Sequence, residues 1–130
     1  MNALRNVLAE DPRISYALVF GSSARGTAHE SSDLDIAVGL DARIRLGALD
    51  LGDLIHRLER ASGRSVDLVV VDEAPPAVAY RIFRDGQVIV DKDHRALVEH
   101  KTRAILEYLD FRPTEALAAR GVLRAAARGR

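Results

Sequence analysis

The chain has 130 residues, no cysteine and a formal net charge of zero, with 48% hydrophobic and 29% charged residues. This is one globular domain's worth of chain, and it excludes a disulfide framework, a thiolate metal site and an overall basic nucleic-acid footprint. No apolar run is long enough to span a membrane and the first residues lack the apolar stretch of a signal peptide, so we expect a cytoplasmic protein.

The N-terminal part of the chain predicts a helix, a strand and a glycine turn. Apolar residues at helical spacing predict a helix over residues 2–10, which Asp11-Pro12 ends. The β-rich apolar run at residues 14–20 predicts a buried strand that Gly21 terminates. Ser22–Gly26 is then expected to form the first turn of a short helix, because serine caps helices and Gly21 allows the sharp bend.

The middle of the chain predicts a second strand and a long helix. Residues alternate over Asp33–Gly39, with Leu34, Ile36 and Val38 expected on one face and Asp33, Asp35 and Ala37 on the other. A stripe of leucine and isoleucine side chains predicts a helix from Asp41 to Ala61, with Gly63 at its C-terminal cap.

The C-terminal half predicts strand, helix, strand and two further helices. Asp93 is expected to cap the first of these two helices, and Pro113 to end it. The predicted elements are Val66–Val71, Ala77–Arg84, Gln87–Val90, Asp93 to about Leu109, and Thr114–Arg128. We therefore expect an α/β (α+β) fold with residues 1–111 as the domain and residues 112–130 as a basic C-terminal helical extension.

Acidic residues interrupt two of the predicted strands. Asp33 and Asp35 project from the same face of a strand, about 7 Å apart, and their like charges repel unless a cation such as Mg²⁺ lies between them. Asp67 interrupts the apolar run VDLVVV, and it meets the other two if its strand lies beside theirs. Three such carboxylates can hold metal and deprotonate a nucleophile. The alternative is that all three lie at strand ends in water.

A glycine turn after a strand leaves backbone N–H groups free to bind an anion, although Gly21-Ser22 matches neither the Walker nor the GxGxxG pattern. Arg25 can bind a phosphate or form a structural ion pair with Asp33 or Asp35. Lys101 and Arg103 can reach a triphosphate or lie on a solvated helix face. The histidines have no zinc-like spacing and predict no site; they are His29, His56, His94 and His100.

The joint pattern resembles the polymerase-β-type nucleotidyltransferase superfamily: Gly21-Ser22, ten intervening residues, Asp33-Leu34-Asp35, and Asp67 on the next strand. The segments GSSARG and SDLDIAV are similar to its minimal nucleotidyltransferase (MNT) branch. The resemblance implies a small mixed sheet flanked by helices. It also implies that Asp33, Asp35 and Asp67 are catalytic and bind Mg²⁺, and that Gly21, Ser22 and Arg25 bind the triphosphate.

Members of the MNT branch are antitoxins of HEPN/MNT toxin-antitoxin systems, so the resemblance also implies a function. The chain would be a Mg²⁺-dependent protein adenylyltransferase that transfers AMP from ATP to a tyrosine of a HEPN-domain ribonuclease toxin encoded nearby. One alternative is a small-molecule nucleotidyltransferase that resembles the aminoglycoside-modifying enzymes. The other is an antitoxin that neutralises its partner by binding alone.

Overall fold

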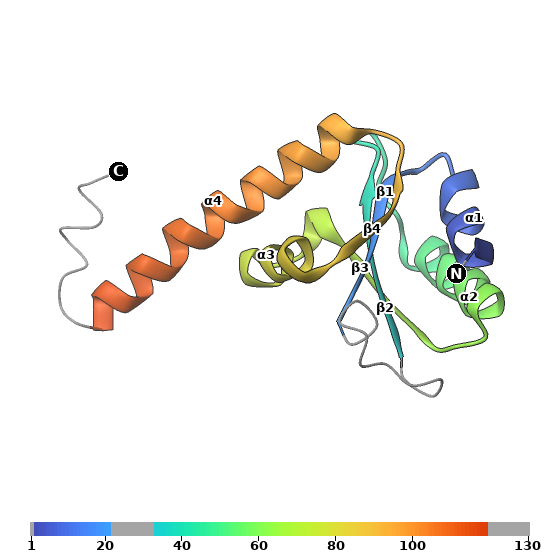
Figure 1. Cartoon of the computed structure of the whole chain (residues 1–130), viewed down its shortest axis with the longest axis horizontal. Coiled ribbons are helices and arrows are strands. Elements are labelled where there is room, and N and C mark those ends of the chain that lie inside the picture. The colour runs from blue at the N-terminus through green and yellow to red at the C-terminus, as the bar shows by residue number, and fades with distance from the viewer. Residues whose placement is uncertain (1, 22–32, 120–130) are drawn as a thin grey trace.

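A computed structural model describes residues 2–21 and 33–119, with side chains described up to residue 110. The described residues form a four-stranded sheet in the order β3-β2-β1-β4 (Figure 1). Strand β1 (Ile14–Phe20) pairs antiparallel with β2 (Leu34–Leu40) and with β4 (Gln87–Asp91), and β3 (Val66–Val70) runs parallel to β2. The predicted fold class is confirmed, because this is a small mixed sheet flanked by helices.

Two pairs of helices cover the two faces of the sheet (Figure 1). Helices α1 (Asn2–Glu10) and α2 (Ala48–Ser62) lie on one face, and α3 (Pro76–Asp85) and α4 (His94–Ala119) lie on the other. The alternation in β2 agrees with the prediction. Its leucine, isoleucine and valine side chains pack with α1 and α2, whereas Ala37 packs with α3 and α4. Strand alternation therefore puts Asp35 on the α3 and α4 face.

Helix α2 begins at Ala48, so the prediction that it begins at Asp41 is wrong. The Asp41 carboxylate accepts hydrogen bonds from the backbone N–H and the guanidinium of Arg43, at 3.0 and 3.2 Å. This local bonding stabilises a turn in place of the first helical turn. The predicted C-terminal cap is confirmed: Gly63 has φ 69° and donates its N–H to the carbonyl of Glu59.

Helix α4 continues through Pro113 to Ala119, so the prediction that Pro113 ends it is wrong. Proline removes one backbone hydrogen bond, and the neighbouring turns keep theirs. The Asp93 carboxylate accepts from the N–H of Ala96 at 3.1 Å, which confirms the predicted cap. Residues 22–26 and 120–128 of the predicted helices lie outside the described residues, and the division at residue 111 stays a prediction. No described helix is both long and apolar enough to cross a membrane.

Charged side chains form hydrogen bonds with backbone groups of both outer strands of the sheet. Arg5 of α1 donates its Nε–H to the carbonyl of Ile89 in β4, at 2.9 Å. Glu59 of α2 accepts the N–H of Val66, the first residue of β3, also at 2.9 Å. These contacts connect α1 to the outer strand β4 and α2 to the outer strand β3.

One carboxylate is buried among the described residues. Asp11, at the end of α1, is 5% exposed and receives two side-chain hydrogen bonds from Arg13, at 2.9 and 2.7 Å. These bonds hold the pKa of Asp11 below its ordinary value, although burial acts in the opposite direction. The pair is therefore ionised at neutral pH and fixes the turn between α1 and β1.

Candidate active site

The register of β2 and β3 brings two of the predicted carboxylates together. Asp35 and Asp67 are direct partners in the parallel pairing, so their side chains leave the same face of the sheet. Asp35 is half-buried and Asp67 is exposed. Asp33, also exposed, directly precedes β2. The prediction that the strand of Asp67 lies beside the Asp33-Leu34-Asp35 strand is therefore confirmed. The alternative, that these carboxylates lie at a sheet edge or at strand ends in water, stays open, because β3 is an outer strand and both Asp33 and Asp67 are exposed.

The glycine turn at the end of β1 lies against this pair. Phe20 is the register partner of Asp35, and the next residue, Gly21, has φ 71°, a left-handed conformation that favours glycine. A Cβ atom on Gly21 would overlap Oδ2 of Asp35. Only glycine satisfies both the backbone angle and this close approach. The other two predicted nucleotide-binding residues, Ser22 and Arg25, lie outside the described residues.

A pocket of about 240 Å³ opens beside the glycine turn, between β1 and α3. Val78 and Ile82 supply apolar lining, Arg81 supplies a guanidinium, and Asp85 supplies a carboxylate that pairs with Arg84. Arg81 is exposed and donates from Nε to the carbonyl of Ala77 at 3.3 Å, which leaves its terminal nitrogens for other contacts. Arg81 is not predictable as a site residue from the sequence, because no spacing within α3 distinguishes it from the neighbouring Arg84.

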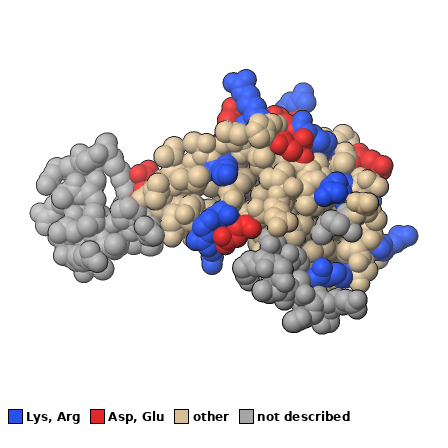
Figure 2. Space-filling model, in the orientation of Figure 1, with Lys and Arg blue, Asp and Glu red and all other residues tan. Residues whose placement is uncertain are grey.

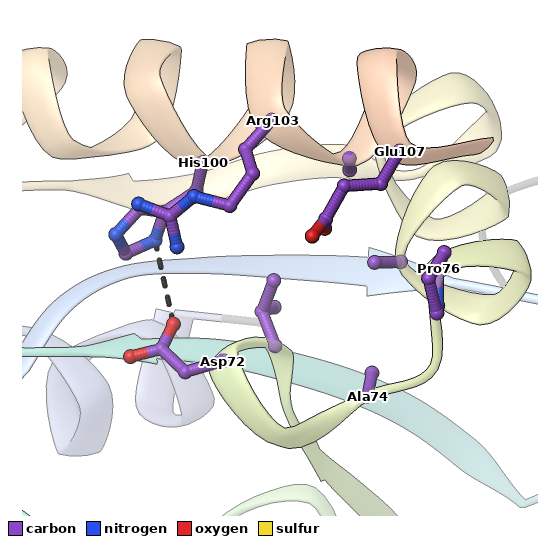
Figure 3. A pocket seen from close by; sticks show the side chains of 9 residues that line it. Asp72, Ala74, Pro76, His100, Arg103 and Glu107 are labelled. Atoms are coloured by element: carbon purple, nitrogen blue, oxygen red, sulfur yellow. Dashed lines mark ion pairs between the residues drawn. The ribbon is translucent and has the colours of Figure 1, made fainter. Parts of the chain in front are cut away.

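A second pocket, of about 220 Å³, lies on the same face between α3, α4 and the 3₁₀ turn η1 (Val71–Glu73) that follows β3 (Figure 3). Asp72, His100, Arg103 and Glu107 supply its charged and polar side chains (Figure 3). The apolar lining comes from Val71, Ala74, Pro76, Ala79 and Ala104. Arg103 thus lines this pocket, and Lys101 is exposed on the same helix.

His100 joins α4 to the sheet at this pocket. Its Nδ1 lies 2.6 Å from the hydroxyl of Tyr16 and 3.4 Å from a carboxylate oxygen of Asp72. Tyr16 is fully buried, and this burial raises the pKa of its phenol above the ordinary value, with a further contribution from Asp72. The ring fits because its register partner is Gly39, where a Cβ atom would overlap it. His100 was not predicted as a site residue, because its spacing from the other histidines indicates no metal site.

The charges on the visible face are mixed. Lys and Arg side chains are spread over the described part of this face in separate groups, with Asp and Glu side chains among them (Figure 2). This part of the surface therefore has no continuous basic stripe of the kind that binds a nucleic-acid backbone.

The carboxylates fit one kind of metal site. Within residues 2–21 and 33–110, no three Asp, Glu, His or Cys side chains converge closely enough to hold an ion by themselves. Mg²⁺ at nucleotide sites needs only one or two carboxylates, since phosphate oxygens and water complete its shell. The opposed Asp35–Asp67 pair beside the Gly21 turn is such a donor set. The residues present therefore fit Mg²⁺ that arrives with a triphosphate.

Proteins of known sequence support the same interpretation. A family model described as polymerase beta, nucleotidyltransferase matches residues 2–95. A Methanocaldococcus jannaschii protein, MJ0435, carries the provisional name protein adenylyltransferase. It is 34% identical over 73 residues, which cover 56% of this chain and 76% of that protein.

Solved structures share the fold over nearly the whole chain. A chain in a crystal structure of a toxin-antitoxin with AMP-PNP superposes with a TM-score of 0.78 at 23% identity, over 94% of this chain and 97% of that one. A chain in a structure of a tri-AMPylated Shewanella oneidensis HEPN toxin in complex with an MNT antitoxin gives 0.68 at 20% identity, over 94% and 91%. With the family model matching well over half of the sequence, this chain belongs to the polymerase beta nucleotidyltransferase family.

Proposed function

We propose that this chain is a nucleotidyltransferase antitoxin that transfers AMP from ATP to a tyrosine hydroxyl of a HEPN ribonuclease toxin and so neutralises it. The observation that carries the proposal is the opposed pair Asp35 and Asp67 against the turn at Gly21. The relatives support it, because one is provisionally named a protein adenylyltransferase and one structure contains a tri-AMPylated HEPN toxin.

The nucleotide would bind at the glycine turn. Backbone N–H groups after Gly21, together with Ser22 and Arg25, would hold the phosphates, as the family resemblance implies. Arg81, on the wall of the adjoining pocket, adds a guanidinium that can pair with a phosphate oxygen. The apolar lining of that pocket suits the less polar part of the nucleotide.

The acidic residues would bind the metal and accept a proton. Asp33, Asp35 and Asp67 would hold Mg²⁺, which supplies neutralisation of the phosphate charge when it is bound. Asp67 is the exposed member of the opposed pair, so it is the one that an incoming hydroxyl can reach. We assign it the role of general base.

The proposed reaction is a single displacement at the α-phosphorus of ATP. Asp67 takes the proton of the tyrosine hydroxyl while the phenolic oxygen forms a bond to the α-phosphorus of ATP. The bond from the α-phosphorus to the bridging oxygen breaks, and pyrophosphate leaves with that electron pair. The toxin then carries AMP on its tyrosine as a phosphodiester.

The direct test mixes the purified protein with ATP, Mg²⁺ and the HEPN protein encoded beside it, and measures the mass of that protein. We expect the wild type to add adenylyl groups and D35N and D67N to lose this activity by about 100-fold or more. D53N is the matched control, since Asp53 is exposed on α2 at the opposite face. If the wild type added no AMP to the HEPN protein, the proposal would be wrong. If D35N still neutralised the toxin fully in cells, the chain would act as an antitoxin that binds its partner without catalysis.

A further inference from the structure

Helix α4 carries two Arg-Glu pairs with the same spacing of four residues, and they behave differently. Arg95 and Glu99 form an ion pair, with Nε and Oε1 3.1 Å apart. Arg103 and Glu107, two turns later, form no ion pair or hydrogen bond with each other or with any other described residue. Oppositely charged side chains spaced i, i+4 on an exposed helix surface stabilise the helix slightly when they form an ion pair. We therefore interpret the unpaired Arg103 and Glu107 as groups that are available to another molecule.

Both of these side chains point into the pocket between α3, α4 and η1 (Figure 3). They descend from α4 toward Asp72 and Ala74, across an apolar lining of alanine, valine and proline side chains. Asp72 is already 3.4 Å from His100. The pocket therefore offers one guanidinium and one carboxylate without a partner in the described part of the chain.

The pocket lies on the face of the sheet that carries the candidate active site. Its lining residues Val71, Ala79 and Ala104 belong to the same packed cluster as Ala37, whose side of β2 Asp35 shares. Asp72 follows Asp67 by five residues along β3 and η1, which corresponds to roughly 15 Å of extended chain. The nucleotide pocket lies at the other end of the strands, beside Gly21, where β1 ends and β2 and β3 begin. The end of this face where β3 runs into η1 is therefore left for the acceptor.

We propose that this pocket is a docking site for the protein acceptor and takes a segment that presents an acidic side chain to Arg103 and a basic one to Glu107. The inference rests on the proposed function. The nucleotide is assigned to the pocket beside Gly21, and a triphosphate in this second pocket would leave the carboxylate of Glu107 without a partner. A peptide segment with charges of both signs matches both open groups, and a volume of about 220 Å³ admits one or two side chains.

The test measures binding of the neighbouring HEPN protein without nucleotide, by calorimetry. We expect R103E and E107R each to weaken this binding at least tenfold, while the affinity for AMP-PNP stays at the wild-type value. The matched control is R95E, which makes the same charge reversal on the same helix at the closed pair. In AMP-transfer assays, R103E should raise KM for the HEPN protein and leave kcat near the wild-type value.

Three results would overturn the docking site. The first is equal binding of the HEPN protein by R103E and R95E. The second is a loss of AMP-PNP affinity in R103E, which would make the pocket part of the nucleotide site. The third is a difference between the wild type and R103E in the mass of the free protein in solution, which would assign the pocket to a second copy of this chain.

The milder variants R103Q and E107Q repeat the binding measurement if a charge reversal impairs folding. A wild type that binds the HEPN protein through Arg103 and yet adds no AMP would refute the proposed function and keep the docking site. The two proposals therefore fail separately.

Discussion

Substitution of Gly21 by alanine tests whether the turn at the end of β1 positions a carboxylate. The residue has φ 71°, and an added Cβ would overlap Oδ2 of Asp35. The variant should therefore lose stability through its backbone and activity through a displaced side chain. Gly63 separates these two effects, because it has φ 69° and no atom lies within 4 Å of its added Cβ.

The left-handed conformation costs a residue other than glycine about 1–2 kcal/mol. Both G21A and G63A should lose roughly this much free energy of unfolding. Only G21A should also move the Asp35 carboxylate, and a misplacement of about 1 Å at a reacting centre can cost about 100-fold in rate. We expect AMP transfer by G21A to fall by about that factor and transfer by G63A to stay near the wild-type rate.

Denaturant unfolding gives the two stabilities, and the mass of the acceptor protein over time gives the two rates. Both assays are run well below the unfolding midpoint, so that both variants are fully folded. If G21A transferred AMP as fast as G63A, Asp35 would not need its present position, and the assignment of this carboxylate to the reaction would fall.

Three further predictions concern stability. Y16F removes the 2.6 Å hydrogen bond to His100 and should cost about 1 kcal/mol. Because burial raises the pKa of Tyr16 above 10.0, this phenol's contribution is fully present below pH 10 and is lost as the pH rises through the raised value. Alkaline denaturation should therefore be weaker in Y16F, and identical curves would contradict this. D11N should cost about 1–3 kcal/mol by leaving Arg13 without its carboxylate. The lowered pKa of Asp11 makes its contribution present above pH 3.8 and lost as the pH falls through the lower folded value, so acid unfolding curves of wild type and D11N should converge. G39A should cost about 1–3 kcal/mol by forcing the Tyr16 ring aside, and an unchanged unfolding midpoint would refute that packing.

Local patterns are sufficient to predict the four strands and the face of β2 that Asp35 takes, but not the strand order of the sheet. Alternation in β2 predicts which side Asp35 takes, and a polar residue near the start of an apolar strand predicts Asp67. The structure supplies the position of β3 next to β2, in register at Asp35 and Asp67. Ser22, Arg25 and the catalytic roles of all these residues stay predictions.

The errors have local physical causes. A single carboxylate, Asp41, bonds the backbone N–H two residues later and delays α2, and periodicity does not detect such a bond. Pro113 lies inside α4, since one missing hydrogen bond does not end a long helix. The contact of His100 with Tyr16 joins residues 84 positions apart, so no spacing rule could find it.

The charged side chains at the two outer strands have a consequence for how other molecules can approach. An unprotected outer strand can recruit an extended peptide, which adds to the sheet or starts aggregation. Here the guanidinium of Arg5 covers Ile89 and the carboxylate of Glu59 covers Val66. Strand addition would have to displace an ionic group on either side, so we expect a partner to recognise helices and loops rather than lengthen the sheet.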